Sequence, residues 1–93
     1  MGYLGVNDAA KLVSNGGVTL TYSGVSYSLA AVQQGGYTFW GYEHLMYKAS
    51  LSGTPLSFAT SLRNQLLSTD GSPLLSSMNV VRGSDGGVVT ADY

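Results

Sequence analysis

The most regular alternation of apolar and polar positions lies between residues 18 and 28, in "VTLTYSGVSYS". In its first half the apolar positions are Val18, Leu20 and Tyr22, and the polar positions are Thr19 and Thr21. A period of two residues is typical of a strand with one buried face. Because Ser23 and Gly24 lie between two β-forming runs, the segment predicts a hairpin with a tight turn.

A long helix is predicted in the second half of the chain. Its apolar positions recur at helical spacing, at Leu56, Ala59, Leu62 and Leu66. Thr54 is expected to cap this helix and Pro55 to occupy its first position, where a proline leaves no N–H group unpaired. Asp70 and Gly71 are expected to end it. The pattern therefore predicts one long amphipathic helix over about residues 55–68.

Two shorter helices are predicted upstream. Asn7 and Asp8 offer an N-cap to "AAKLVSN", and the glycines at 16–17 are expected to stop that helix. Ser28 is expected to cap "LAAVQQ", which the glycines at 35–36 would end.

Short strands are predicted at both ends of the chain. "GYLGV", residues 2–6, has the apolar content of a short buried strand. After a helical turn in "SPLLSSM" (72–78), residues 79–93 predict a strand, an Asp-Gly-Gly turn and a second short strand. This order indicates an α/β or α+β class with a small mixed sheet. We expect a single small domain over residues 1–93, in which the tail from about residue 84 could be loose.

The stretch "GGYTFWGYEHLMYK", residues 35–48, holds the only Trp, the only His and the only Glu of the chain. As a strand it would direct alternate side chains to two faces, whereas as a helix it would form two adjacent stripes. Its aromatic and threonine content after two glycines favours the strand. Length does not decide between the two, and "YEHLMYKA" is also compatible with a helix. The conformation of residues 39–48 therefore stays open.

Six residues of this stretch are the candidates for contact with a ligand or a partner: Tyr37, Phe39, Trp40, Tyr42, His44 and Tyr47. Aromatic rings of this kind stack on sugars or bases. Five aromatic residues in eleven, with little charge nearby, are also typical of a core or interface strand. The composition favours this second interpretation.

Charged residues are scarce, at 10% of the chain against about 25% in typical domains. The net charge is −1, so electrostatic repulsion between copies is weak. We therefore expect a homo-oligomer, or a chain that packs against a larger partner. The four cations are scattered and form no stripe for phosphates, which argues against nucleic-acid binding.

Cysteine is absent, which excludes disulfides, zinc–thiolate sites and thiol nucleophiles. No charged segment followed by an apolar run opens the chain, so we expect no signal peptide in it. The uninterrupted apolar runs are only a few residues long, so we expect no membrane span.

Glu43 and His44 are the only adjacent acid and potential base. On a strand they would point to opposite faces and could not act on one group. No second histidine is present for a metalloprotease helix, and no G-x-S-x-G motif accompanies the thirteen serines. "GSDGG", residues 83–87, lacks the Lys-Ser/Thr of a phosphate loop and predicts a turn. We therefore expect no catalytic residue, no metal site and no cofactor, and infer that the protein is not an enzyme.

Several short motifs follow one another in a fixed order. "GYLG" at residues 2–5 comes first, followed by Gly24 and by "GY" at residues 36–37. "YE" at residues 42–43 and the helix from Thr54 complete the series. In this order the motifs resemble the C-terminal part of phosphate-binding periplasmic proteins, the solute receptors of phosphate ABC transporters.

The similarity covers about residues 2–70, with two departures: Met1 stands where isoleucine is common, and Thr38 replaces a proline. The resemblance implies that the chain corresponds to part of one lobe of a class II periplasmic binding protein. It also implies a periplasmic or extracellular location. The family's anion-binding groups lie upstream of the matching region. The resemblance therefore assigns no binding residue here, although a small anion remains a candidate ligand.

These observations lead to three hypotheses. The first is a non-enzymatic binding or self-assembly module, resembling a detached piece of a phosphate-type solute-binding protein, that associates through exposed strands and aromatics. The second is a small-ligand binder whose aromatic cleft forms between subunits and is lined by Trp40, Tyr42 and His44. The third, and least favoured, is a small hydrolase that uses His44.

Overall fold

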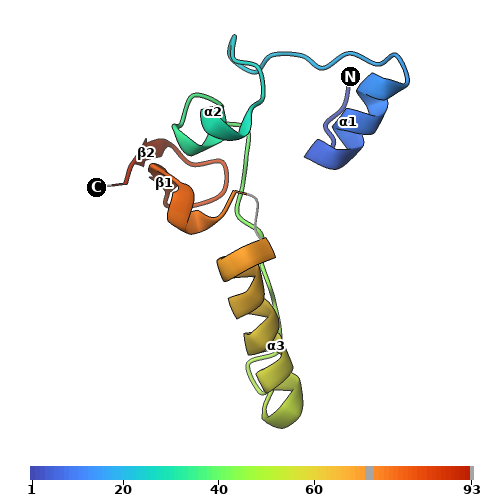
Figure 1. Cartoon of the computed structure of the whole chain (residues 1–93). Helices are drawn as coiled ribbons and strands as arrows, with labels where there is room; N and C mark the ends of the chain where they lie inside the picture. The colour runs from blue at the N-terminus through green and yellow to red at the C-terminus, as the bar shows by residue number, and fades with distance from the viewer. Residues whose placement is uncertain (71–72, 93) are drawn as a thin grey trace.

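The computed structural model describes residues 1–70 and 73–92 (Figure 1). Its α-helices are α1 (Val6–Ser14), α2 (Leu29–Gln33) and α3 (Gly53–Gln65). A π-helical turn (Leu66–Asp70) continues α3, and a 3₁₀ turn (Leu75–Ser77) precedes the strands β1 (Val80–Arg82) and β2 (Val89–Ala91). Within the described residues, the sheet consists of β1 and β2 alone, which run antiparallel. The class is therefore α+β, and the expected mixed sheet is wrong.

The first helix begins earlier than its expected cap. α1 starts at Val6, directly after Gly5, and Asp8 lies within its first turn, where a negative charge favours the positive end of the helix. The strand expected over residues 2–6 is wrong, because residues 2–5 are exposed and have no regular structure. A lone extended segment with no neighbouring strand gains no ladder of hydrogen bonds.

The end of α1 follows the sequence closely. Gly16 has φ +86° and donates its N–H to the Val13 carbonyl at 3.1 Å. Gly17 donates its N–H to the Leu12 carbonyl at 2.9 Å. These two bonds form a Schellman motif, which satisfies carbonyls that the helix leaves without partners. The predicted glycine stop is confirmed.

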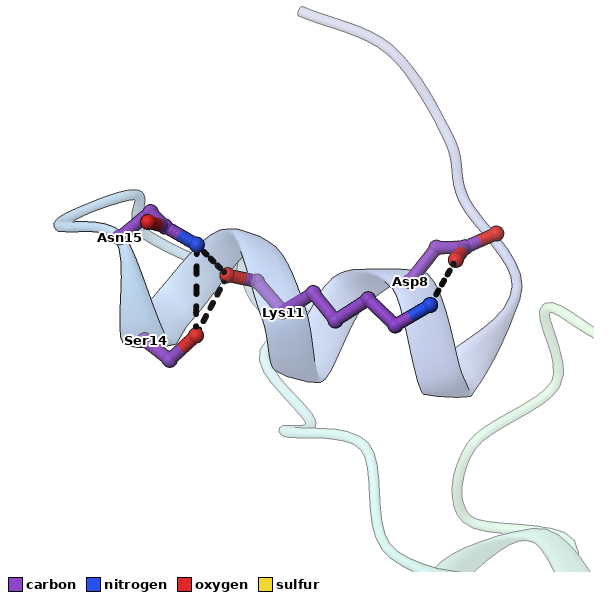
Figure 2. Close-up of polar contacts among 4 residues, drawn as sticks. All are labelled: Asp8, Lys11, Ser14 and Asn15. Carbon is purple, nitrogen blue, oxygen red and sulfur yellow. Dashed lines mark hydrogen bonds and ion pairs between the residues drawn. The ribbon is translucent and has the colours of Figure 1, made fainter.

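Local polar contacts line the surface of α1 (Figure 2). Ser14 Oγ and Asn15 Nδ2 donate to the Lys11 carbonyl at 2.7 and 2.8 Å. Lys11 Nζ lies 3.5 Å from Asp8 Oδ1. All four residues are exposed, so these contacts stabilise the helix itself and attach it to no other element.

The predicted hairpin forms its turn but not its strands. Ser23 has φ +50° and Gly24 has φ +79°, the two positive values that a type I′ turn requires. Tyr22 and Val25 exchange both main-chain hydrogen bonds across this turn, at 2.9 and 3.0 Å. In the described part of the chain, this bridge is the only strand-like pairing that the hairpin makes.

The cap of α2 explains why the hairpin stops there. As predicted, Ser28 caps this helix, and its Oγ accepts the N–H of Ala31 at 3.0 Å. The residues that would have continued the hairpin, 26–28, lead instead into this cap and form no ladder with residues 19–21 in the described structure. Residues 18–21 are left without a neighbouring strand (Figure 1).

The C-terminal hairpin is confirmed. Val81 lies opposite Thr90 in the ladder, and Gly87 donates its N–H to the Ser84 carbonyl at 2.9 Å to close the connecting turn. Residues 83–87 therefore form a turn, as predicted. The looseness considered for the chain from about residue 84 stays a prediction, although β2 within it pairs with β1.

The end of α2 is attached to this hairpin. Asn79 donates its N–H to the Gln33 carbonyl at 2.9 Å, and Gln33 Nε2 donates to Ser77 Oγ at 3.0 Å. Gly35, which follows α2, has φ +80°, and a Cβ placed on it would lie 2.8 Å from Val80 Cγ1. Glycine is therefore required here both for its backbone conformation and for close packing.

The long helix is confirmed, but its start is not the predicted one. α3 begins at Gly53, which has φ +66°, and Ser52 occupies the cap position without a side-chain bond. The predicted cap at Thr54 is wrong, because the left-handed turn at Gly53 brings the chain into the helix earlier. Pro55 stands third rather than first in the helix, still among the N–H positions that lack an intrahelical acceptor.

Very little of the chain is buried. Among the described apolar residues, only Val32 and Ala59 are buried. Along the predicted stripe of α3, Leu56 and Leu66 are half-buried and Leu62 is exposed. The radius of gyration is 16.1 Å, against about 12 Å for a compact domain of this length. Figure 1 shows α1 and α3 standing away from the unit of α2 and the hairpin. No helix in the described ranges is long and apolar enough to cross a membrane.

We expect Gly35→Ala to destabilise the protein by about 3 kcal/mol, from backbone strain together with the contact against Val80. Gly16→Ala is the matched control, because Gly16 has a similar φ of +86° but nothing lies within 4 Å of its added Cβ. We expect that variant to lose only about 1 kcal/mol. Urea denaturation of both variants measures the difference, and equal losses would show that α2 does not pack on β1.

Candidate functional site

The segment Thr38–His44, called the strap below, crosses from the end of α2 toward α3 and is held against the C-terminal hairpin. It forms neither the strand nor the helix considered above, since it has no regular hydrogen-bonding ladder. Two residues of the hairpin, Arg82 and Asp85, bind it through side-chain contacts. These contacts replace the backbone pairing that a strand would have needed.

Arg82 is the main anchor of the strap. Its side chain is almost fully removed from solvent, with 6% of the residue exposed. Its guanidinium donates to the carbonyls of Thr38, at 2.8 Å, and Trp40. Its central carbon also lies 4.3 Å from the centre of the Trp40 ring. Hydrogen bonds to a charged group contribute about 1.5–3 kcal/mol each, and a desolvated cation–π contact adds up to about 2 kcal/mol.

Burial of this charge is not fully compensated. Among the described residues, Arg82 Nε and Trp40 Nε1 are buried donors without a hydrogen-bond partner. A buried donor that loses its water costs about 1–3 kcal/mol. The net stabilisation of the strap is therefore the gain from the contacts of Arg82 minus the cost of these two unpaired donors.

Tyr42 covers the edge of β1. Its hydroxyl accepts the N–H of Arg82 at 3.1 Å and donates to the Arg82 carbonyl at 3.2 Å. These main-chain groups would otherwise be open for pairing with another strand. The edge of the hairpin is thus protected at Arg82 by a side chain of the strap.

Asp85 binds the far end of the strap. Its Oδ1 accepts the N–H of Tyr42 at 2.9 Å, and its Oδ2 lies 2.6 Å from His44 Nε2. Because an ionised carboxylate only accepts hydrogen bonds, Nε2 carries the proton in this contact. The hydrogen bond from His44, and after it the N–H of Tyr42, lowers the pKa of Asp85.

The six candidate residues divide between two faces of the chain. Trp40, Tyr42 and His44 contact the hairpin, as described above. Tyr37 and Phe39 lie on the other side, and Phe39 stacks on Tyr22 with 5.2 Å between ring centres. The alternation of faces expected for a strand is therefore present, although the strand is not. Tyr47 is exposed and belongs to neither group.

Tyr37 and Phe39 belong to a wider cluster of rings drawn from distant parts of the chain. Tyr27 meets Tyr37 edge-on at 5.6 Å, and Tyr3 meets Phe39 edge-on at 6.3 Å. Such aromatic pairs contribute about 0.5–1.5 kcal/mol beyond the area they bury. The cluster brings Tyr3 and the N-terminal hairpin turn near the strap.

This aromatic cluster forms one wall of a wide, open cleft with a volume of about 1870 Å³. Other parts of its lining come from α1, from residues 18–22 and from the end of α3, including Leu12, Leu20 and Leu62. Small-molecule sites usually have volumes of about 300–1000 Å³. The cleft is therefore larger and more open than a typical small-ligand pocket.

The geometry offers little support for catalysis. His44 and Asp85 form a pair at the surface, but no serine or threonine hydroxyl in the described ranges hydrogen-bonds to His44. Over the same residues, no three His, Asp or Glu side chains come together to hold a metal ion. The contacts that Arg82 and Asp85 make with the strap, called the clasp below, position a segment of the chain.

No family model, no curated protein and no solved structure matches the chain. The resemblance to phosphate receptors therefore stays a prediction. Arg82 and Asp85, which hold the strap, are absent from the candidates that the sequence suggested. Arg82 lies in a strand-forming run and Asp85 in a turn motif, and neither pattern indicates a partner forty residues away.

We expect Arg82→Lys to destabilise the protein by about 2 kcal/mol, because a lysine cannot bond both carbonyls while stacking on Trp40. Trp40 is the only tryptophan, so its fluorescence should shift to longer wavelength as the strap loosens. Arg63→Lys is the control, since Arg63 is exposed on α3 and should change stability by less than about 0.5 kcal/mol. An unchanged Trp40 emission in Arg82→Lys would contradict the clasp.

Acid should release the far end of the strap. Because the pKa of Asp85 is lower in the folded chain than in the unfolded one, its stabilisation is complete above an unfolded pKa of about 3.9. It is lost as the pH falls through the lowered value. We expect Asp85→Asn to reduce the acid-induced change in Trp40 fluorescence below about pH 4. Asp8→Asn, on α1, should leave that change as in the unmodified protein.

Proposed function

We propose that the protein is a non-enzymatic association module that covers its open surface by binding a second copy of itself. The observation that carries the proposal is its accessible surface of 7256 Å². A compact monomer of 9.7 kDa exposes about 5,100 Å². The chain therefore exposes about 2,100 Å² more than a self-sufficient domain of its mass.

The size of this excess fits protein association. A standard interface buries about 800 Å² on each partner, and interfaces of obligate dimers are larger and more apolar. The uncovered surface includes large apolar side chains on separate elements, such as Val13 on α1 and Phe58 on α3. Exposed large apolar side chains are more numerous here than the scattered single ones that a monomer normally shows.

The charge of the chain favours a second copy as the partner. The net charge is −1, so two copies approach each other with little repulsion. A partner of opposite charge would need a charged patch to recognise, and the four cations and five acids are spread along the sequence. Apolar and aromatic contacts are therefore the main recognition that this surface offers.

An origin within a phosphate-receptor-like fold, and the periplasmic or extracellular location that comes with it, belong to the proposal as a secondary part. Their support is the order of short motifs along residues 2–70. Self-association does not depend on this origin, since it rests on the uncovered surface.

A second candidate function is binding of a small ligand in the aromatic cleft. Its support is the lining of the open cleft, which includes the three residues that the sequence suggested for its wall, Trp40, Tyr42 and His44. The rings of Tyr37 and Phe39 lie on the same cleft. On this account the cleft would become narrow enough for a ligand only after two subunits had come together. Such a ligand would raise the melting temperature, because it binds only the folded form.

Light scattering across a concentration series tests self-association. We expect a native mass of about twice the 9.7 kDa of the chain at micromolar concentration and above. Circular dichroism on the same samples establishes that the chain is folded. A folded monomer at every concentration would refute the proposal.

A further inference from the structure

Residues 18–22 form an exposed segment of β-forming residues that the fold leaves uncovered. Its apolar side chains have exposed fractions of 78% for Val18, 66% for Leu20 and 43% for Tyr22. In the described structure, no main-chain group of residues 18–21 hydrogen-bonds to another part of the chain. The segment therefore combines β-forming residues with an open backbone edge.

The sequence around this segment lacks the usual protection of an edge strand. No charged residue occurs between Lys11 and Glu43. Residues 18–22 contain neither a proline nor a glycine. Natural sheets commonly place charges or prolines on edges that must stay unpaired. Their absence here indicates an edge that another strand covers.

The turn at Ser23–Gly24 determines which edge of the segment faces away from the rest of the hairpin. Tyr22 directs its N–H and carbonyl toward Val25. In an extended strand, alternate residues direct these groups to opposite edges, so Thr19 and Thr21 direct theirs away from the turn's second arm. The edge that belongs to the two threonines is therefore the one that faces away from residues 25–28.

We propose that this edge pairs with the same edge of a second copy, antiparallel, about a twofold axis at Leu20. This register places Leu20 opposite Leu20 as a close, non-hydrogen-bonded pair and makes Thr19 and Thr21 of opposite copies exchange main-chain hydrogen bonds. It also places Val18 opposite Tyr22. Aromatic–β-branched and Thr–Thr pairs are among the stabilising cross-strand pairs, so the segment is complementary to itself.

The pairing would also begin to cover the cleft. Residues 18–22 line it, and Tyr22 stacks on Phe39 at 5.2 Å, so a paired strand would extend the aromatic wall with the side chains of the second copy. Isologous contacts of this kind close at two subunits. The inference rests on the proposed self-association and names the segment and register through which it occurs.

Single cysteine variants test the register, because the chain has no cysteine of its own. In the proposed pair, the Cα atoms of the two residues 20 lie about 4.5 Å apart, within the range of a disulfide. Those of the two residues 19 lie more than about 8 Å apart, which is too far. With oxidised glutathione as oxidant, we expect Leu20→Cys to form covalent dimer at least about tenfold faster than Thr19→Cys, since pairing raises the local thiol concentration.

A mixture of Thr19→Cys and Thr21→Cys provides an independent variant pair. We expect it to form the mixed disulfide faster than either variant forms its own, because residues 19 and 21 of opposite copies face each other. Equal rates for all variants, with a dimeric native mass, would overturn the inference and leave self-association standing. A folded unmodified chain that stays monomeric would overturn both. Circular dichroism of each reduced variant establishes that it is folded.

Discussion

The guanidinium of Arg82 is the group on which the arrangement of the chain depends. It joins β1 to the carbonyls of Thr38 and Trp40, which lie about forty residues earlier, and it stacks on the Trp40 ring. Because the described chain buries only Val32 and Ala59 among its apolar residues, no continuous hydrophobic core performs this task. A charged clasp therefore holds together elements that most small domains join by apolar packing.

Because a charged clasp stands in place of a hydrophobic core, the fold is incomplete. A polar clasp is directional, and it positions the strap without covering the helices on either side. Burial of the charge also leaves Arg82 Nε and Trp40 Nε1 without hydrogen-bond partners in the described structure. This cost offsets part of the free energy that the contacts of Arg82 contribute. The large accessible surface follows directly, because large apolar side chains of α1 and α3 are exposed and, among the described residues, no separate helix or strand packs extensively against these two helices.

The strap contacts the C-terminal hairpin on one side and the aromatic cluster on the other. Its side toward the hairpin is occupied, since Tyr42 covers the edge of β1 and Asp85 holds Tyr42 and His44. Its other side presents Phe39, beside the neighbouring Tyr37, to the aromatic cluster and the open cleft. Residues of both sides of the strap line the open cleft, since Trp40 and Tyr42 border it as well as Phe39. One edge of the protein is thus protected by a side chain, whereas the edge at residues 18–22 is not.

The sequence by itself determined the features that close within a few residues. The glycine stop of α1, the Ser28 cap, the turn at Ser23–Gly24 and the C-terminal hairpin depend on local hydrogen bonds and backbone preferences, so their residue types predict them. The tertiary structure decided whether β-forming segments pair, and it left residues 2–5 and 18–21 without partners. It also brought Arg82 and Asp85 to the strap. A strand needs a neighbour, and a contact across forty residues has no local pattern, so neither outcome could be predicted from composition or spacing.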